Sequence, residues 1–170
     1  MVTTPDAIAL LKQDHRTVEE LFASFEKAKG DERKRKLAEQ ICLELVIHTA
    51  LEEEIFYPAC EGKVEEDLLK EAHVEHDSAK VLVAEILAGG PDEEFYDAKV
   101  KVLQEQIEHH VKEEEKGGEG IFAQAKKADI DVKSMGEQLA MRKEELQTEY
   151  QENGIPTPQL KTLDETSVGS

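Results

Sequence analysis

The sequence has few of the residues that disulfide-stapled or membrane-spanning proteins require. It contains no tryptophan, five prolines and only two cysteines among 170 residues. Two thiols without a CxxC pair do not make a disulfide framework. We therefore expect Cys42 and Cys60 to be reduced and packed. No apolar run approaches the roughly 20 residues that a membrane-spanning helix needs.

Positive charge is also scarce. The sequence has 21 Lys and Arg residues and 39 Asp and Glu residues, which gives a formal net charge of −18. Nucleic-acid binding requires a basic surface that neutralises phosphates, and anionic membranes attract basic segments. The charge therefore predicts neither a nucleic-acid nor a membrane partner. The opening MVTTPDAIALLKQDH has no basic region followed by an apolar block, so we expect no signal peptide and a cytoplasmic protein.

Helix-forming residues dominate the chain, and strand signals are nearly absent. Hydrophobic residues make up 39% of the sequence, which is a globular composition. Gly-containing turns divide it, and Asp92 is a candidate N-cap after the third of them. Long helices joined by short connections favour an all-α, antiparallel up-down-up-down four-helix bundle. The four predicted helices cover residues 5–28, 32–59, 64–88 and 92–115.

The regular pattern stops after residue 115. The KGGEG segment at 116–120 must break or bulge the fourth helix, because closely spaced glycines are poor helix formers. A charged helical segment at 133–151 carries a thin apolar stripe that could dock outside the bundle. The predicted organisation is a bundle over 1–130, an appended C-terminal helix over 131–152 and a flexible tail over 153–170. The appended helix is the candidate surface for a protein partner.

Polar residues interrupt the apolar stripe of the second predicted helix, in the stretch HTALEEEIFYP at 48–58. The stripe runs through Ile41, Leu45, His48, Glu52 and Ile55/Phe56. The HxxxE spacing places an imidazole and a carboxylate on one helix face, one turn apart. Both side chains should therefore point into the core.

The same arrangement occurs twice along the chain. His76 repeats His15 at an offset of 61 residues, and a second HxxxE motif repeats the first at an offset of 62. Apolar stripes surround these positions on all four helices. The inward-facing set is His15, His48, Glu52, His76, His110 and Glu114.

A metal site explains this set better than six separate core polar residues do. A single buried histidine is usually just hydrogen-bonded, but buried glutamates are costly unless they are paired, ligated or protonated. The lack of thiolates disfavours a structural zinc site, and the imidazoles disfavour calcium and magnesium. The set suits iron, manganese or, in a wrong-metal preparation, zinc. Two ions could each take two histidines and share both glutamates, which leaves positions open for a small ligand.

The sequence resembles the hemerythrin-like, HHE cation-binding family. The matching motifs are DH at 14–15, HTALEEEIFYP at 48–58, VEH at 74–76, and HHVKEEE followed by IF within 109–122. The resemblance implies a four-helix bundle around a non-haem di-iron centre with an oxo or hydroxo bridge. It also implies the same six ligands, with Glu52 and Glu114 bridging. Oxygen-carrying hemerythrins have a further histidine where this chain offers glutamates, which weakens a plain oxygen-carrier interpretation.

Two histidines leave alternatives open. The HHVKEEE segment also permits a pair formed by His109 and Glu113, although the stripe and the repeat favour His110. His73 lies one turn before His76 and could be a seventh ligand, a hydrogen-bond donor to a ligand, or a residue at the rim. Its repeat partner is Lys12, which favours the latter two roles. Tyr57 and the nearby phenylalanines are interpreted as core or as the wall of the site.

The function predicted from these residues is reversible binding or reduction of oxygen, peroxide or nitric oxide by a sensor, redox or stress protein. No general acid or base can be chosen from the sequence. An alternative is iron storage or donation to damaged iron centres, for which the Gly-rich break could provide an exit. A third is a helical interaction protein with a vestigial site.

Overall fold

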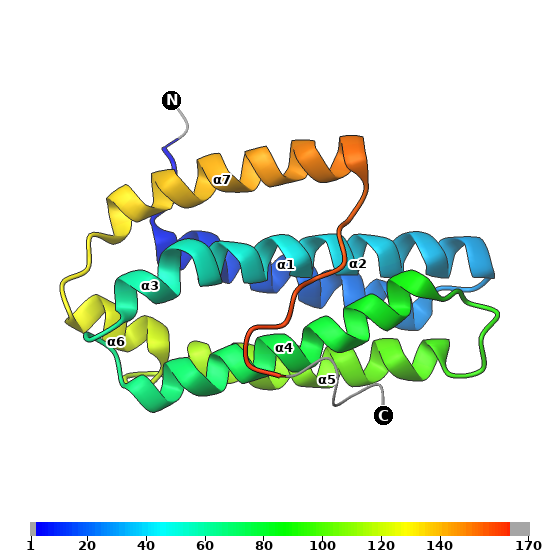
Figure 1. Cartoon of the computed structure of the whole chain (residues 1–170), viewed down its shortest axis with the longest axis horizontal. Helices are drawn as coiled ribbons and strands as arrows, with labels where there is room; N and C mark the ends of the chain where they lie inside the picture. The colour runs from blue at the N-terminus through cyan, green and yellow to red at the C-terminus, as the bar shows by residue number, and fades with distance from the viewer. Residues whose placement is uncertain (1–2, 164–170) are drawn as a thin grey trace.

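The computed structural model describes residues 3–163, which form a helical bundle without strands (Figure 1). Its long helices run back and forth along the long axis of the molecule. They are α1 (Ala7–Lys27), α2 (Asp31–Leu51), α4 (Glu66–Ala88) and α5 (Tyr96–Glu114). Helix α1 packs against α2 and α5, and α4 packs against α5 and α2, so the four enclose one core. The predicted all-α fold is confirmed.

The helix starts show where local signals hold and where packing overrides them. Asp6 caps α1 by accepting a hydrogen bond from the backbone N–H of Ala9 at 2.8 Å. The predicted start of the fourth helix at residue 92 was wrong, and Asp92 does not cap α5. Residues 91–95 form turns, and α5 begins at Tyr96. The side chain of Tyr96 is buried against Phe25, with 6.4 Å between ring centroids. Burial of this ring fixes the start of the helix.

The second predicted helix changes its pitch near its end. A π-helical turn, η1 (Glu52–Phe56), follows α2 and leads into α3 (Tyr57–Cys60). The backbone N–H of Tyr57 bonds to the carbonyl of Glu52, five residues earlier. Because this turn is wider than an α-helical turn, Glu52, Glu53, Phe56 and Tyr57 are all buried.

The glycine-rich segment ends the fourth bundle helix, as the sequence predicts. Helix α5 ends at Glu114, and a short α6 (Ile121–Lys127) follows the turn. Gly118 has φ of 75°, a conformation that favours glycine. Ile121 and Phe122 then return to the core.

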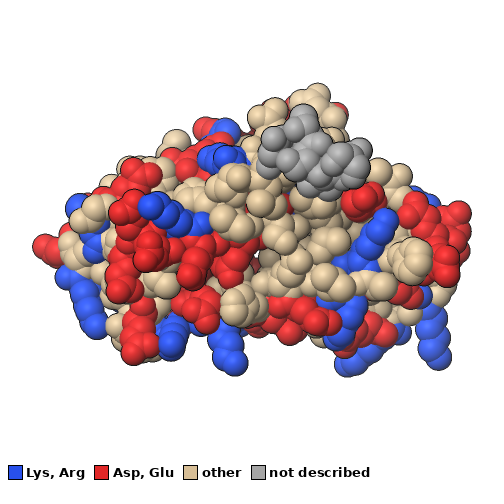
Figure 2. Space-filling model, turned by 60° about the horizontal axis from the view of Figure 1, so that its bottom comes forward, with Lys and Arg blue, Asp and Glu red and all other residues tan. Residues whose placement is uncertain are grey.

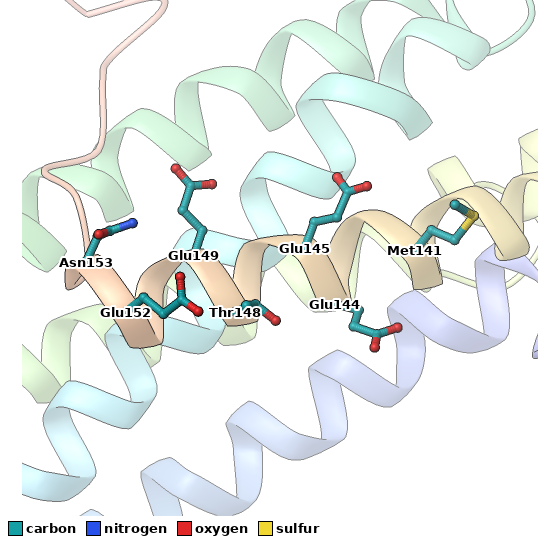
Figure 3. Close-up of a pocket in the computed structure, with 7 residues that line it drawn as sticks. All are labelled: Met141, Glu144, Glu145, Thr148, Glu149, Glu152 and Asn153. Carbon is teal, nitrogen blue, oxygen red and sulfur yellow. The ribbon is translucent and has the colours of Figure 1, made fainter.

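Helix α7 (Val132–Asn153) lies outside the four and packs against α1 and α2 (Figure 1). It buries Met135, Leu139 and Leu146 toward the bundle. Its other side borders an open hollow with many carboxylates (Figure 3). The residues that line it are Met141, Glu144, Glu145, Thr148, Glu149, Glu152 and Asn153. The thin stripe therefore docks α7 through one side only.

The chain beyond α7 crosses over α2 and α4 (Figure 1). The buried carboxylate of Asp77 accepts hydrogen bonds from the backbone N–H groups of Lys161 and Leu163, both at 2.9 Å. It also accepts hydrogen bonds from the backbone and hydroxyl of Thr162. The tail predicted over 153–170 thus begins with a segment held on the bundle. Residues 164–170 lie outside the described part of the chain.

Acidic side chains are abundant on the surface, with lysines and arginines among them (Figure 2). This distribution agrees with the net charge of −18. Within residues 3–163, no helix has the length and apolar character needed to cross a bilayer.

Gly136 allows α7 to approach the start of α1 closely, and we expect Gly136→Ala to disturb this contact. A Cβ at position 136 would meet the Pro5 carbonyl oxygen and would lie 2.8 Å from the Cα of Asp6, so backbone has to move. Urea denaturation should show a loss of about 1–3 kcal/mol in unfolding free energy. Gly117→Ala is the control, because no atom lies within 4 Å of its added Cβ. Equal effects of the two changes would contradict close docking at Gly136.

Candidate metal centre

Each of the four bundle helices contributes one buried histidine to the same region of the core. The Nε2 atoms of His15 on α1 and His48 on α2 lie 3.2 Å apart. Those of His76 on α4 and His110 on α5 are also 3.2 Å apart. None of the four residues is more than 5% exposed. The core therefore contains two facing histidine pairs, one from each half of the chain.

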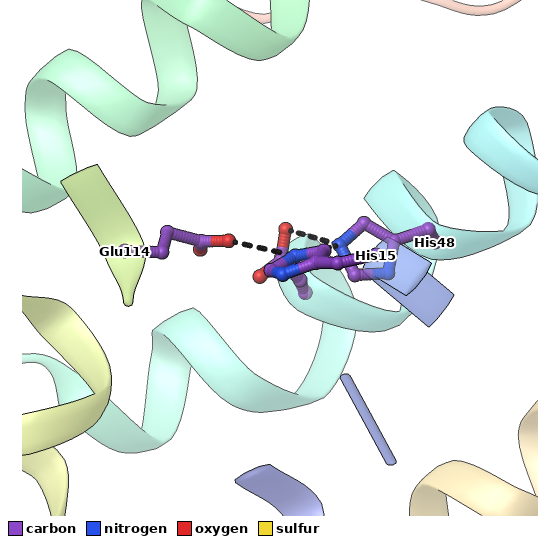
Figure 4. Close-up of side chains that lie close together, drawn as sticks. His15, His48 and Glu114 are labelled. Atoms are coloured by element: carbon purple, nitrogen blue, oxygen red, sulfur yellow. Dashed lines mark hydrogen bonds and ion pairs between the residues drawn. The ribbon is translucent and has the colours of Figure 1, made fainter. Parts of the chain in front are cut away.

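Two glutamates lie between these pairs. Glu52 Oε1 is 3.1 Å from the Nε2 atoms of both His48 and His76. Glu114 Oε1 is 3.3 Å from His15 Nε2 and 3.2 Å from His110 Nε2. Figure 4 shows Glu114 reaching from its own helix towards His15. The structure thus brings all six sequence-predicted residues together, with each carboxylate adjacent to both pairs.

The donor atoms converge in two groups. In each group, one ligand atom from every member lies within 4.8 Å of the others, which is compatible with a shared cation. One group is His15, His48, Glu52 and Glu114, and the other is Glu52, His76 and His110. Glu52 belongs to both groups, as a bridging carboxylate would.

Every histidine of the centre is held at its other nitrogen by a carboxylate. With Nδ1–H donating outward, the Nε2 lone pair points to the centre, which is the orientation a metal ligand needs. The Nδ1–carboxylate pairs are His15–Glu115 at 2.7 Å, His48–Asp14 at 3.1 Å, His76–Glu53 at 2.8 Å and His110–Glu75 at 2.8 Å. We call these four acidic residues the bracing carboxylates.

The bracing carboxylates were not predicted from the sequence, although they follow the internal repeat. Asp14 and Glu75 each precede one histidine of the centre and bind the other histidine of their own half. Glu53 and Glu115 each follow a glutamate of the centre and bind a histidine of the opposite half. The sequence signal that could have revealed them is an acidic residue directly next to a predicted ligand, at equivalent positions in both halves.

Tyr57 also belongs to the centre, beyond the core or wall role expected from the sequence. Its hydroxyl donates to Glu114 Oε2 at 2.6 Å and lies 3.2 Å from Glu52 Oε1 and 3.3 Å from His76 Nε2. In a continuous α-helix, residues five apart are separated by about 140° around the axis. The π-helical turn brings Glu52 and Tyr57 to the same side. Burial, together with the two carboxylates, raises the pKa of Tyr57 well above its usual value.

The two remaining histidines lie outside the converging donor atoms. The His73 ring is half-buried and contacts the Tyr57 ring edge-on, with 5.2 Å between centroids. His109 is 65% exposed at its side chain, and its Nε2 lies 3.3 Å from Glu75. The structure thus directs His110 inward and His109 outward, in the register that the apolar stripe favours.

The buried carboxylates of the centre are stabilised by positive charge. Burial alone would lower the pKa of His48, but Glu52 and Asp14 outweigh it and raise this pKa to about 10. Burial would raise the pKa of Glu52, yet the surrounding imidazoles, His48 foremost, hold it well below its usual range. Glu52 is therefore anionic, and without a metal ion a protonated His48 balances its charge.

Two buried oxygens of these carboxylates have no hydrogen-bond donor within residues 3–163 and are free to bind a cation. Within the described residues, Glu52 Oε2 and Glu114 Oε1 accept no hydrogen bond. The imidazole nitrogens near Glu114 Oε1 are close enough but lack hydrogen-bond geometry. Buried polar atoms are rarely left unpaired. Four imidazoles with two carboxylates and no thiolate form a donor set suited to iron or manganese.

A helical bundle with paired histidines and carboxylates converging in its core defines a class of cation-binding proteins. The model of one family, the hemerythrin HHE cation binding domain, matches residues 6–117, which is more than half of the chain. The chain belongs to this hemerythrin HHE cation-binding family.

Two known proteins illustrate the similarity. A crystal structure of a hemerythrin HHE cation binding domain-containing protein from Mycobacterium kansasii superposes with a TM-score of 0.72 at 23% identity. The match covers 91% of this chain and 96% of that one, and it shows a shared fold. A DNA nickase from Nostoc sp. is 26% identical over 106 residues. These residues are 62% of this chain and 30% of the nickase, so the chain matches less than a third of that protein.

We expect His110→Ala to weaken metal binding far more than His109→Ala does. His110 is buried with Nε2 among the converging donors, whereas His109 points to solvent. Ferrous iron or cobalt titration of both variants measures the difference. Equal losses, or a larger loss in His109→Ala, would show that the register of the second HxxxE motif is Glu113 with His109.

The metal-free protein should lose stability as the pH rises above about 6.5. The pKa of His48 is about 10 in the folded state against 6.5 for the free side chain. Its stabilisation is thus complete below 6.5 and is lost as the pH rises through 10. The pKa of Glu53 is about 2 against 4.5, because hydrogen bonds from His76 and Lys80 outweigh burial, so its contribution is lost only in acid.

Thermal unfolding in chelator, measured from pH 5 to 10, tests this pH dependence. The midpoint should be highest between about pH 4.5 and 6.5 and should fall towards pH 10. The stabilisation added by metal should instead grow from pH 5 to 8, because protons compete with the cation for imidazole. A chelated protein that becomes more stable from pH 7 to 10 would contradict the assignment.

Proposed function

We propose that this chain holds two iron ions in a non-haem centre that binds or reduces oxygen, peroxide or nitric oxide. The observation that carries the proposal is the pair of facing histidine pairs with two glutamates between them. One ion would be held by His15 and His48 and the other by His76 and His110, and both would share Glu52 and Glu114. Four protein ligands for each ion leave coordination positions for a small ligand.

Iron bound there would supply the redox chemistry, and the surrounding residues define what can reach it. The six residues are each at most 5% exposed, so a ligand of few atoms suits the centre best. Phe122 stacks on His15 with 5.7 Å between ring centroids, and Phe56 packs against Phe122. These rings form an apolar wall that excludes bulk water from one side.

The Tyr57 hydroxyl is the protein group best placed to hold a proton inside the centre. It already donates to Glu114, and its raised pKa keeps the O–H intact at neutral pH. A group that retains its proton can donate a hydrogen bond to a small anionic or polar ligand. This position supports ligand binding or reduction as the function of the centre.

Iron storage or donation is the alternative, and the bracing carboxylates count against it. Each ligand histidine is fixed at Nδ1, and three of the bracing carboxylates contact a lysine or arginine. Release of iron would require these linked contacts to open together. Retention of the ions with reaction of a small ligand is therefore the favoured function.

Anaerobic titration with ferrous iron should saturate at about two ions per chain. Oxygen, hydrogen peroxide or nitric oxide, added separately to the loaded protein, should change its absorption spectrum. Tyr57→Phe should still load about two ions but should react with an altered rate or spectrum, because the proton inside the centre is removed. Glu52→Gln is the comparison for loss of a shared ligand and should reduce the stoichiometry.

Saturation at one ion or none would contradict the di-iron proposal. The loaded protein could instead show no spectral change with any of the three ligands and transfer its iron to an apo iron-protein acceptor. That result would support iron donation.

A further inference from the structure

The bracing carboxylates are themselves held by basic groups on their outer sides. Each contact joins a side chain of the centre to a cation, or to a histidine, closer to the surface. The pairs are Asp14–Lys143 at 2.6 Å, Glu53–Lys80 at 2.9 Å, Glu53–Lys161 at 3.3 Å, Glu75–His109 at 3.3 Å and Glu115–Arg16. Lys80, His109 and Arg16 lie within residues 6–117, which the family model covers, whereas Lys143 on α7 and Lys161 beyond that helix lie outside the range.

Lys143 is connected to the centre by one buried carboxylate. Its Nζ donates to Asp14 Oδ1 at 2.6 Å, and the other oxygen, Asp14 Oδ2, accepts from His48 Nδ1 at 3.1 Å. The Asp14 side chain is 4% exposed, so little water competes for it. Each oxygen of Asp14 thus has one partner, and together they fix its orientation. His48 Nε2 then lies 3.1 Å from Glu52 Oε1.

Apolar side chains dock α7 on the bundle in addition to this lysine. Met135, Leu139 and Leu146 bury the apolar stripe of the helix, and Gly136 allows its close approach to α1. The neighbouring Arg142 forms a two-nitrogen contact with Glu54, which is exposed and touches no ligand of the centre. Two adjacent basic residues therefore hold carboxylates of the bundle, but only Lys143 holds one that binds a ligand histidine.

We propose that α7 is a functional part of the metal centre and that Lys143 is a positioning residue, which acts through Asp14 on His48. The proposal rests on the metal centre described under Proposed function. Outer partners of metal-bound histidines fix the ring orientation and raise ligand basicity. Loss of the Lys143 charge would free Asp14 to turn away from His48. It would also remove a positive charge near the metal. Removal of this charge favours the oxidised, more positive state of the metal.

The test compares Lys143→Met, Lys143→Arg and Arg142→Met in the full-length chain. Methionine keeps an unbranched side chain of similar length without the charge, and arginine restores the charge. Lys143→Met should weaken ferrous iron binding about tenfold or more and should lower the reduction potential of the loaded centre. Lys143→Arg should recover most of both properties. Arg142→Met should change iron affinity by less than about twofold, because exposed ion pairs contribute little.

A readout in chelator separates this inference from the di-iron proposal. The imidazole Nδ1–H of His48, observed by proton NMR in isotope-labelled protein, should be protected from exchange in the wild type and in Arg142→Met. It should exchange faster in Lys143→Met. Failure of the wild type to bind iron would overturn the di-iron proposal, whereas this proton still reports whether Lys143 positions His48.

Two results would overturn the role of Lys143. If Lys143→Met keeps the iron affinity and the His48 Nδ1–H protection of the wild type, Asp14 holds His48 without a contact from α7. Equal losses in Lys143→Met and Arg142→Met would show that both residues act only by docking the helix.

Discussion

Two glutamates with almost no solvent exposure, Glu52 and Glu114, impose the constraint on which the rest of the structure depends. A carboxylate in a protein core is unfavourable unless positive charge or hydrogen-bond donors surround it. Four imidazoles supply the inner layer, four bracing carboxylates orient the imidazoles, and basic side chains hold the carboxylates. Acidic and basic side chains thus alternate from the centre of the bundle to its surface.

This polar layer divides the hydrophobic core into two parts. One cluster joins the start of α1, the end of α2 and α6, and it includes Leu11, Leu51 and Phe122. The other joins the end of α1 with the start of α2 and α5, and it includes Phe22 and Leu103. The two clusters pack the helices on either side of the centre. The ligand residues can therefore be placed by packing that does not involve them, which is what a preorganised site requires.

The features that were predictable from sequence are those that repeat locally. Apolar residues at helical spacing reveal the four helices, and the 61- and 62-residue offsets reveal the six inward polar positions. Tyr57 was not recognised as part of the centre, because a single π-helical turn changes the helix phase without a periodic signal. The bracing carboxylates were hidden among 39 acidic residues. The start of α5 coincides with the buried Tyr96, and the contact of Lys143 with Asp14 depends on how α7 docks, so both are set by tertiary packing.

The crossed arrangement of the two halves bears on how such a centre can arise. Each helix pair contributes two histidines and one glutamate to the centre, and its Glu53 or Glu115 braces a histidine of the opposite pair. One pair alone is therefore half a centre, whereas two copies related by a twofold axis make a whole one. A helix pair of this kind would need a second copy, or a fused partner, to complete the centre. The two halves are also not equivalent in the present chain: the first has the π-helical turn with Tyr57, and the second has the glycine-rich break.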